Sequence, residues 1–99
     1  MAGRDYPVPG FHPFSITVKI EGQQRRFTVL QTLKGIGEEH YKIIARNKTL
    51  LFSTNKPIVQ RRGLENFPWT WTLIEGELRN QRALEAITAA LEMKLRNSL

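Results

Sequence analysis

The chain has 99 residues, a net charge of +6 at neutral pH and no cysteine. This length suits one domain rather than two, and a hydrophobic fraction of 40% is enough for a globular core. The lack of cysteine excludes disulfide bonds, cysteine-ligated zinc and a thiol nucleophile. Apolar runs fall far short of the ~20 residues that span a bilayer, and small secreted domains often need disulfides. We therefore predict a cytoplasmic protein that does not enter membranes.

The positive charge is unevenly distributed along the chain. Residues 1–62 contain 11 Lys and Arg against 4 Asp and Glu, a net charge of +7, whereas residues 63–99 contain 4 against 5, a net charge of −1. Such asymmetry attracts polyanions, and it also serves simply to keep a surface soluble. Both interpretations stay open at this point.

The first 13 residues are rich in proline and glycine, including Pro7, Pro9 and Pro13. Proline has no backbone N–H and restricts the residue before it, so this stretch is unsuited to a helix or a β-ladder. The sequence predicts an extended, flexible arm over residues 1–13 and a single α+β domain over residues 14–99.

A two-residue hydrophobic period begins at Phe14. Apolar residues alternate with polar ones as far as Ile20, which is typical of a strand with one buried face. A turn with Gly22 follows, and a second alternating run covers Arg25–Leu33. Two such runs around a short glycine-containing turn predict a β-hairpin.

The middle of the chain is expected to contribute further short strands. The pattern predicts strands at His40–Arg46 and Thr49–Ser53, and Pro57 then interrupts the chain. Ile58–Arg61 is interpreted as a short strand or an extended linker. Alternation returns over Trp69–Glu75, which predicts one more strand.

The last segment has the composition and period of a helix. Residues Asn80–Arg96 contain neither glycine nor proline and are dominated by strong helix formers. Asn80 is the expected N-cap. Leucine and isoleucine recur at helical spacing and predict an apolar stripe, with its members at Leu84, Ile87, Leu91 and Leu95.

A sheet with one apolar face and a helix with one apolar stripe bury each other when they pack together. We therefore predict an α+β fold, an antiparallel β-meander of four to five strands packed against one C-terminal α-helix. The order of four strands followed by a helix resembles the repeat unit of the Whirly and Pur-alpha single-strand-binding folds. The resemblance is one of architecture, and it implies a single-stranded nucleic acid as ligand.

Catalytic and metal-binding patterns are weak throughout. Gly35-Ile36-Gly37 lacks the third glycine and the following helix of a phosphate-binding loop. His12 and His40 are the two histidines, and no third ligand is placed beside them. Glu38 and Glu39 are neighbours, so on an extended chain they face opposite sides and cannot share a proton. No catalytic residue, metal or cofactor is predicted, and the protein is expected not to be an enzyme.

Phe67, Trp69 and Trp71 form an aromatic series with a spacing of two. On a strand they share one face. They are interpreted first as core residues beneath the C-terminal helix, because aromatic side chains bury large apolar areas. The alternative is an exposed aromatic patch on which bases stack or a partner protein docks.

The basic residues of the predicted sheet carry the best functional signal. If Phe14, Phe27 and Tyr41 face the core, the opposite face presents hydroxyl side chains and four cations, namely Lys19, Arg26, Lys42 and Arg46. These four are the candidate nucleic-acid-binding residues. We expect a small basic binding module whose ligand is single-stranded nucleic acid. The alternative is an assembly subunit that docks on another protein, or on a second copy as a homodimer, through a sheet edge or the aromatic patch.

Overall fold

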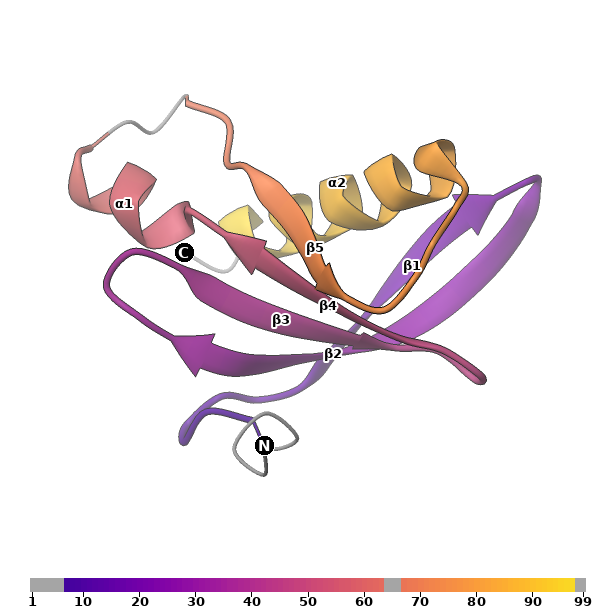
Figure 1. Cartoon of the computed structure of the whole chain (residues 1–99), viewed down its shortest axis with the longest axis horizontal. Helices are drawn as coiled ribbons and strands as arrows, with labels where there is room; N and C mark the ends of the chain where they lie inside the picture. The colour runs from indigo at the N-terminus through magenta and orange to yellow at the C-terminus, as the bar shows by residue number, and fades with distance from the viewer. Residues whose placement is uncertain (1–6, 64–66, 98–99) are drawn as a thin grey trace.

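The computed structural model describes residues 7–63 and 67–97. Within them the chain forms five strands and two helices (Figure 1). The strands form one open antiparallel sheet in the order β1-β2-β3-β4-β5, so every strand pairs with its neighbour in sequence. The α+β meander with a C-terminal helix is thus confirmed. The elements in chain order are β1 (Phe14–Ile20), β2 (Gln23–Lys34), β3 (Glu39–Ile44), β4 (Thr49–Thr54), α1 (Lys56–Arg61), β5 (Trp71–Glu75) and α2 (Gln81–Asn97).

The first hairpin follows from its sequence pattern. Phe14 pairs with Val29 and Ile20 with Gln23, so the alternating apolar residues of the two strands share one face. Glu21 and Gly22 both have positive φ angles in the turn, a conformation that glycine adopts without steric cost. The pairing of β2 with β3 shifts register between Gln31 and Leu33, and an extra residue of this kind bends a strand.

Helix α2 covers the apolar face of the sheet (Figure 1). Its side-chain contacts come from the predicted stripe: Ile87 and Leu91 are fully buried, Leu95 is buried and Leu84 is half-buried. Asn80 caps the helix, because its Oδ1 accepts hydrogen bonds from the backbone N–H groups of Arg82 (3.0 Å) and Ala83 (3.2 Å).

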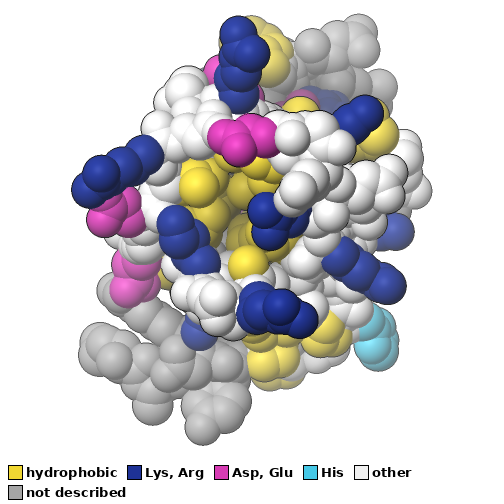
Figure 2. Space-filling view, turned by 90° about the vertical axis from the view of Figure 1, so that its right-hand side faces the viewer, with side chains coloured by type: hydrophobic (Ala, Val, Ile, Leu, Met, Phe, Trp, Pro, Cys, Tyr) yellow, Lys and Arg dark blue, Asp and Glu magenta, His cyan; other side chains and the backbone are white. Residues whose placement is uncertain are grey.

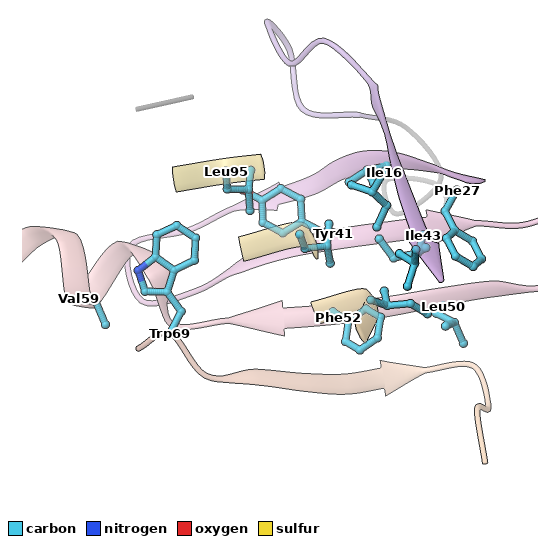
Figure 3. Packing of buried hydrophobic residues seen from close by; sticks show 13 residues of the cluster. Ile16, Phe27, Tyr41, Ile43, Leu50, Phe52, Val59, Trp69 and Leu95 are labelled. Atoms are coloured by element: carbon cyan, nitrogen blue, oxygen red, sulfur yellow. The ribbon is translucent and has the colours of Figure 1, made fainter. Parts of the chain in front are cut away.

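The hydrophobic core lies between the sheet and α2 (Figure 3). Tyr41 and Ile43 of the central strand β3 and Phe52 of its neighbour β4 are each about 1% exposed and form its middle. In Figure 3 the indole of Trp69 lies at one end of this cluster, between Val59 of α1 and Leu95 of α2.

The prediction for Ile58–Arg61 is wrong, because this segment belongs to the short helix α1. Pro57 lies in the first turn, where a helix needs no backbone N–H donor and where the fixed φ angle of proline suits the helix. The N–H groups of Ile58 and Val59 donate to the carbonyl of Asn55. The turn also buries the side chain of Val59, which joins the core.

The N-terminal arm is described from Pro7 onward; its residues 1–6 lie outside the described part of the chain. The N–H of Val8 donates to the carbonyl of Gln31 (2.7 Å), on the side of β2 that β1 no longer covers. The ring of Phe11 lies 5.9 Å from that of Phe14 and 6.3 Å from that of Tyr41. The arm therefore contacts the domain through Val8 and Phe11, and its flexibility stays a prediction.

Candidate nucleic-acid interface and the polar groups around it

The sheet has an outer face, which is the face opposite α2. Strand alternation and register place its residues in rows that cross the strands. One row contains Thr17 and Arg26, and the next contains Ser15, Thr28, Ile44 and Thr49. A third row contains Leu30, Lys42, Leu51 and Glu75, and a fourth contains Leu33, His40, Ser53 and Thr72. The outer face is thus basic and hydroxyl-rich at the β1–β2 hairpin, mixes two leucines with Lys42 and Glu75 in its third row, and is mainly polar near α1.

Three of the four candidate cations lie at the hairpin end of the outer face. Lys19 and Arg26 are exposed, and they lie on neighbouring strands in adjacent rows. Arg46 is exposed in the turn beyond the end of β3. It follows Ile44, the partner of Thr28, and so lies toward the row of Arg26. Figure 2 views this end of the molecule and shows lysine and arginine side chains on several sides of a hydrophobic area.

Lys42 differs from the other three cations. It is half-buried in the third row, where its strand neighbours are Leu30 and Leu51. It also has an interaction partner within the chain. A cation that is already engaged and partly covered contributes less to phosphate binding than an exposed one. The structure therefore places Lys19 and Arg26 on neighbouring strands of one hairpin, Arg46 in the β3–β4 turn at the same end of the sheet, and Lys42 apart from them.

The aromatic series lies on the α2 side of the sheet, not on the outer face. Trp69 is 5% exposed and Phe67 is 55% exposed, and neither belongs to a strand because β5 begins at Trp71. Arg96 of α2 holds this segment: its guanidinium lies 4.3 Å from the centre of the Trp69 ring, and its Nη2 donates to the carbonyl of Phe67 (3.0 Å). One face of Trp69 is thus occupied by a cation of the same chain.

Trp71 is half-buried and is also engaged. Its indole N–H donates to Glu92 Oε1 (3.1 Å), and Glu92 Oε2 accepts from Arg96 (3.0 Å). The strand aromatics Phe27, Tyr41 and Phe52 lie in the core with it. The described part of the outer face therefore has no aromatic platform for bases, and its exposed polar groups are cations and hydroxyls.

A shallow pocket of about 530 Å³ opens at the α1 end of the outer face. Its lining combines hydroxyl groups, one carboxylate and two exposed apolar side chains, contributed mainly by Ser53, Thr70, Thr72, Glu38, Leu33 and Ile36. The Gly35–Gly37 loop forms one wall, and its turn is closed by a hydrogen bond from the N–H of Gly35 to the carbonyl of Glu38 (2.9 Å). The GxG segment is therefore a connection between strands that also shapes a pocket.

The carboxylate in this pocket is fixed and ionised. Ser53 Oγ donates a hydrogen bond to Glu38 Oε2, and His40 Nε2 lies 3.2 Å from the same oxygen. The bond from Ser53, followed by the contact with His40, holds the pKa of Glu38 below its usual value. The three side chains do not form a catalytic triad, because the serine hydroxyl donates to the carboxylate and not to the histidine.

A second polar group, which the sequence did not reveal, lies on the core side of the sheet. Gln31 Nε2 donates to the hydroxyl of Tyr41 (2.9 Å), and that hydroxyl donates to Glu39 Oε1 (2.6 Å). Lys56 Nζ lies 3.1 Å from the same oxygen. Burial and the Glu39 carboxylate raise the pKa of Tyr41 far above its usual value, so the hydroxyl stays protonated as a donor.

Glu38 and Glu39 face opposite sides of the sheet, as the alternation predicted: Glu38 bonds to Ser53 on the outer face and Glu39 to Tyr41 beneath it. Strand parity would also have located the buried network, since Gln31 follows Phe27 and Val29 at core-facing positions. Polar residues at such positions have to be hydrogen-bonded.

Across residues 7–63 and 67–97, no three side chains of the metal-ligating types cluster as an ion would require. None of the described helices is both long and apolar enough to cross a bilayer.

Comparison with known proteins finds no relative of this chain. No family model, no curated protein and no solved structure matches the chain.

Proposed function

We propose that this protein binds single-stranded nucleic acid through the outer face of its sheet. The observation that carries the proposal is the composition of the first rows at the β1–β2 hairpin. Exposed Lys19 and Arg26 lie there among the hydroxyls of Thr17 and Thr28, and exposed Arg46 lies in the β3–β4 turn at the same end of the sheet. Cations and hydroxyls of this kind bind phosphate oxygens.

Lys19 and Arg26 lie on a two-stranded part of the β1–β2 hairpin, because the pairing of β2 with β3 begins only at Thr28. A two-stranded ribbon also fits the major groove of a duplex, so a duplex of the same length is the comparison that tests the preference for a single strand. Binding through phosphates positions a strand without reading its bases. Contact with three cations should make affinity fall with salt at a log–log slope of roughly −2, at about −0.7 per phosphate contact.

The test is fluorescence anisotropy with a labelled oligo(dT) strand at several salt concentrations. Arg26→Ala should weaken binding severalfold and make the slope shallower by about 0.7. Arg62→Ala is the matched control, because Arg62 is exposed at the end of α1, at the opposite end of the molecule from the hairpin (Figure 1). Arg82 is a poor control, since it lines a small pocket together with Lys19.

Failure to bind at tens of micromolar protein, or equal losses from Arg26→Ala and Arg62→Ala, would overturn this proposal. A second candidate function would then lead, namely assembly with another protein through the β5 edge. It is favoured by the position of β5 at the edge of the open sheet and by Ile74, which is 43% exposed on that strand. Light scattering across a concentration series would detect self-association.

A further inference from the structure

The pocket at the α1 end of the outer face is not used by the phosphate contacts proposed above. It lies on the same side of the sheet as the cations, because Leu33, Ser53 and Thr72 share the outer-face row of His40. The register shift between Gln31 and Leu33 turns Leu33 to that face. From Arg26 to Leu33 the chain advances seven residues along β2, which is about 23 Å at roughly 3.3 Å per residue. A bound strand of a few nucleotides would reach from the hairpin cations to this pocket.

The carboxylate of Glu38 is the directional group of the pocket. Ser53 donates to its Oε2, and His40 Nε2 lies 3.2 Å from that oxygen without forming a hydrogen bond. Oε1 and the second lone pair of Oε2 therefore remain as acceptors for two donors of a ligand. The exposed side chains of Leu33 and Ile36 form an apolar part of the lining, where one face of a flat ring can lie. The pocket therefore suits a flat ligand that presents N–H donors at its edge.

Charge separates two kinds of ligand with N–H donors. A small organic cation would have to approach a protein of net charge +6. It would also pass Arg61, whose guanidinium donates to the carbonyl of Ile36 in the pocket wall. A nucleotide brings N–H donors for Glu38 together with phosphate charge that Arg61 attracts, so it fits both features.

Among the bases, guanine matches a carboxylate best. Its N1–H and N2–H₂ groups are adjacent donors on one edge, whereas the other bases place a donor beside an acceptor on that edge. Neighbouring hydroxyls of Thr70 and Thr72 are available for the remaining polar atoms of the ring.

We propose that the pocket formed by Glu38, Ser53 and Thr72 holds one guanine base of the bound single strand. This inference rests on the proposed function, which it extends from phosphate contacts to the choice of base. A carboxylate that accepts two N–H donors distinguishes the correct base by roughly tenfold.

The experiment compares labelled oligo(dT) strands that contain one central guanine, one central inosine or no substitution. The strand with guanine should bind roughly tenfold more tightly than plain oligo(dT), and inosine, which lacks the N2 amine, should lose most of that gain. Glu38→Gln should abolish the preference for guanine while plain oligo(dT) binds at least as well, because one negative charge is removed. Ser53→Ala, which frees the carboxylate to move, should reduce the preference partially.

Glu85→Gln is the matched control, since it removes one exposed carboxylate from α2 and should leave the guanine preference intact. Free guanosine monophosphate is added as a competitor of the labelled strand. Weak competition supports a base held as part of a strand. Strong competition would show a site for the free nucleotide and would overturn the proposal. Equal binding of all three strands by the wild type, or a preference that survives Glu38→Gln, would also overturn it and would leave the phosphate interface standing. Loss of binding to every strand would instead refute the proposed function itself.

Discussion

Tyr41→Phe tests whether the buried polar network stabilises the fold. The ring of Tyr41 is 1% exposed, and the substitution keeps it while removing the hydroxyl that links Gln31 to Glu39. The variant therefore leaves the apolar core intact and deletes two hydrogen bonds at once.

The magnitude follows from what remains after the deletion. Glu39 keeps Lys56 at 3.1 Å, so its charge is not left without a partner. The amide of Gln31, in a residue only 7% exposed, loses its acceptor. One charge-assisted bond and one buried unpaired donor together predict a loss of about 2–3 kcal/mol in the free energy of unfolding. For a domain of this size, that loss lowers Tm by roughly 10–20 °C.

Urea denaturation monitored by circular dichroism measures the free energy, and a double-mutant cycle with Glu39→Gln isolates the Tyr41–Glu39 term. A loss below half a kcal/mol, or no coupling in the cycle, would refute the reasoning. The raised pKa of Tyr41 gives an independent check. Its proton is held more tightly in the folded state, so its contribution is fully present below pH ~10 and declines as pH rises above that value. Tyr41→Phe should lack this part of the alkaline decline.

Two further predictions concern packing. Leu91→Ala should lower the free energy of unfolding in urea by about 2–5 kcal/mol, because Leu91 is fully buried on the core-facing side of α2. Met93→Ala, at a position 66% exposed on the same helix, should cost almost nothing. Equal effects would show that the predicted stripe is not the packed face. Gly76→Ala should cost more than about 1 kcal/mol, because Gly76 has a φ of 94° and an added Cβ would lie 2.5 Å from the carbonyl oxygen of Thr49. An unchanged Tm of the Gly76→Ala variant would contradict this prediction. Gly22→Ala is the control that separates backbone strain from steric overlap, because Gly22 has a φ of 80° but open space around it.

The sheet and α2 could be predicted because each repeats its period over many residues. Alternation from Phe14 to Ile20 corresponds to β1, and the leucine spacing of α2 identifies its buried face. Helix α1 could not be predicted, because its six residues are too few to show a helical period. Pro57 also suits both the end of a strand and the first turn of a helix.

The candidate site was predictable in part for a similar reason. Parity places Arg26 on the outer face, but it does not reveal that Lys42 is half-buried and already engaged. The pocket around Glu38 depends on contacts between residues 15 positions apart, such as Ser53 with Glu38. No local pattern in the sequence reports contacts of that range.

The topology of the sheet has a consequence for the order of folding. Each strand pairs with the strand before it in the chain, so the first four strands can pair by closing short loops, each at a small cost in entropy. The contact of α2 with β1 is different, because it joins elements separated by most of the domain. Closing that long loop is entropically expensive until the intervening strands have shortened the path. The helix should therefore dock last, onto a sheet whose apolar face is already assembled.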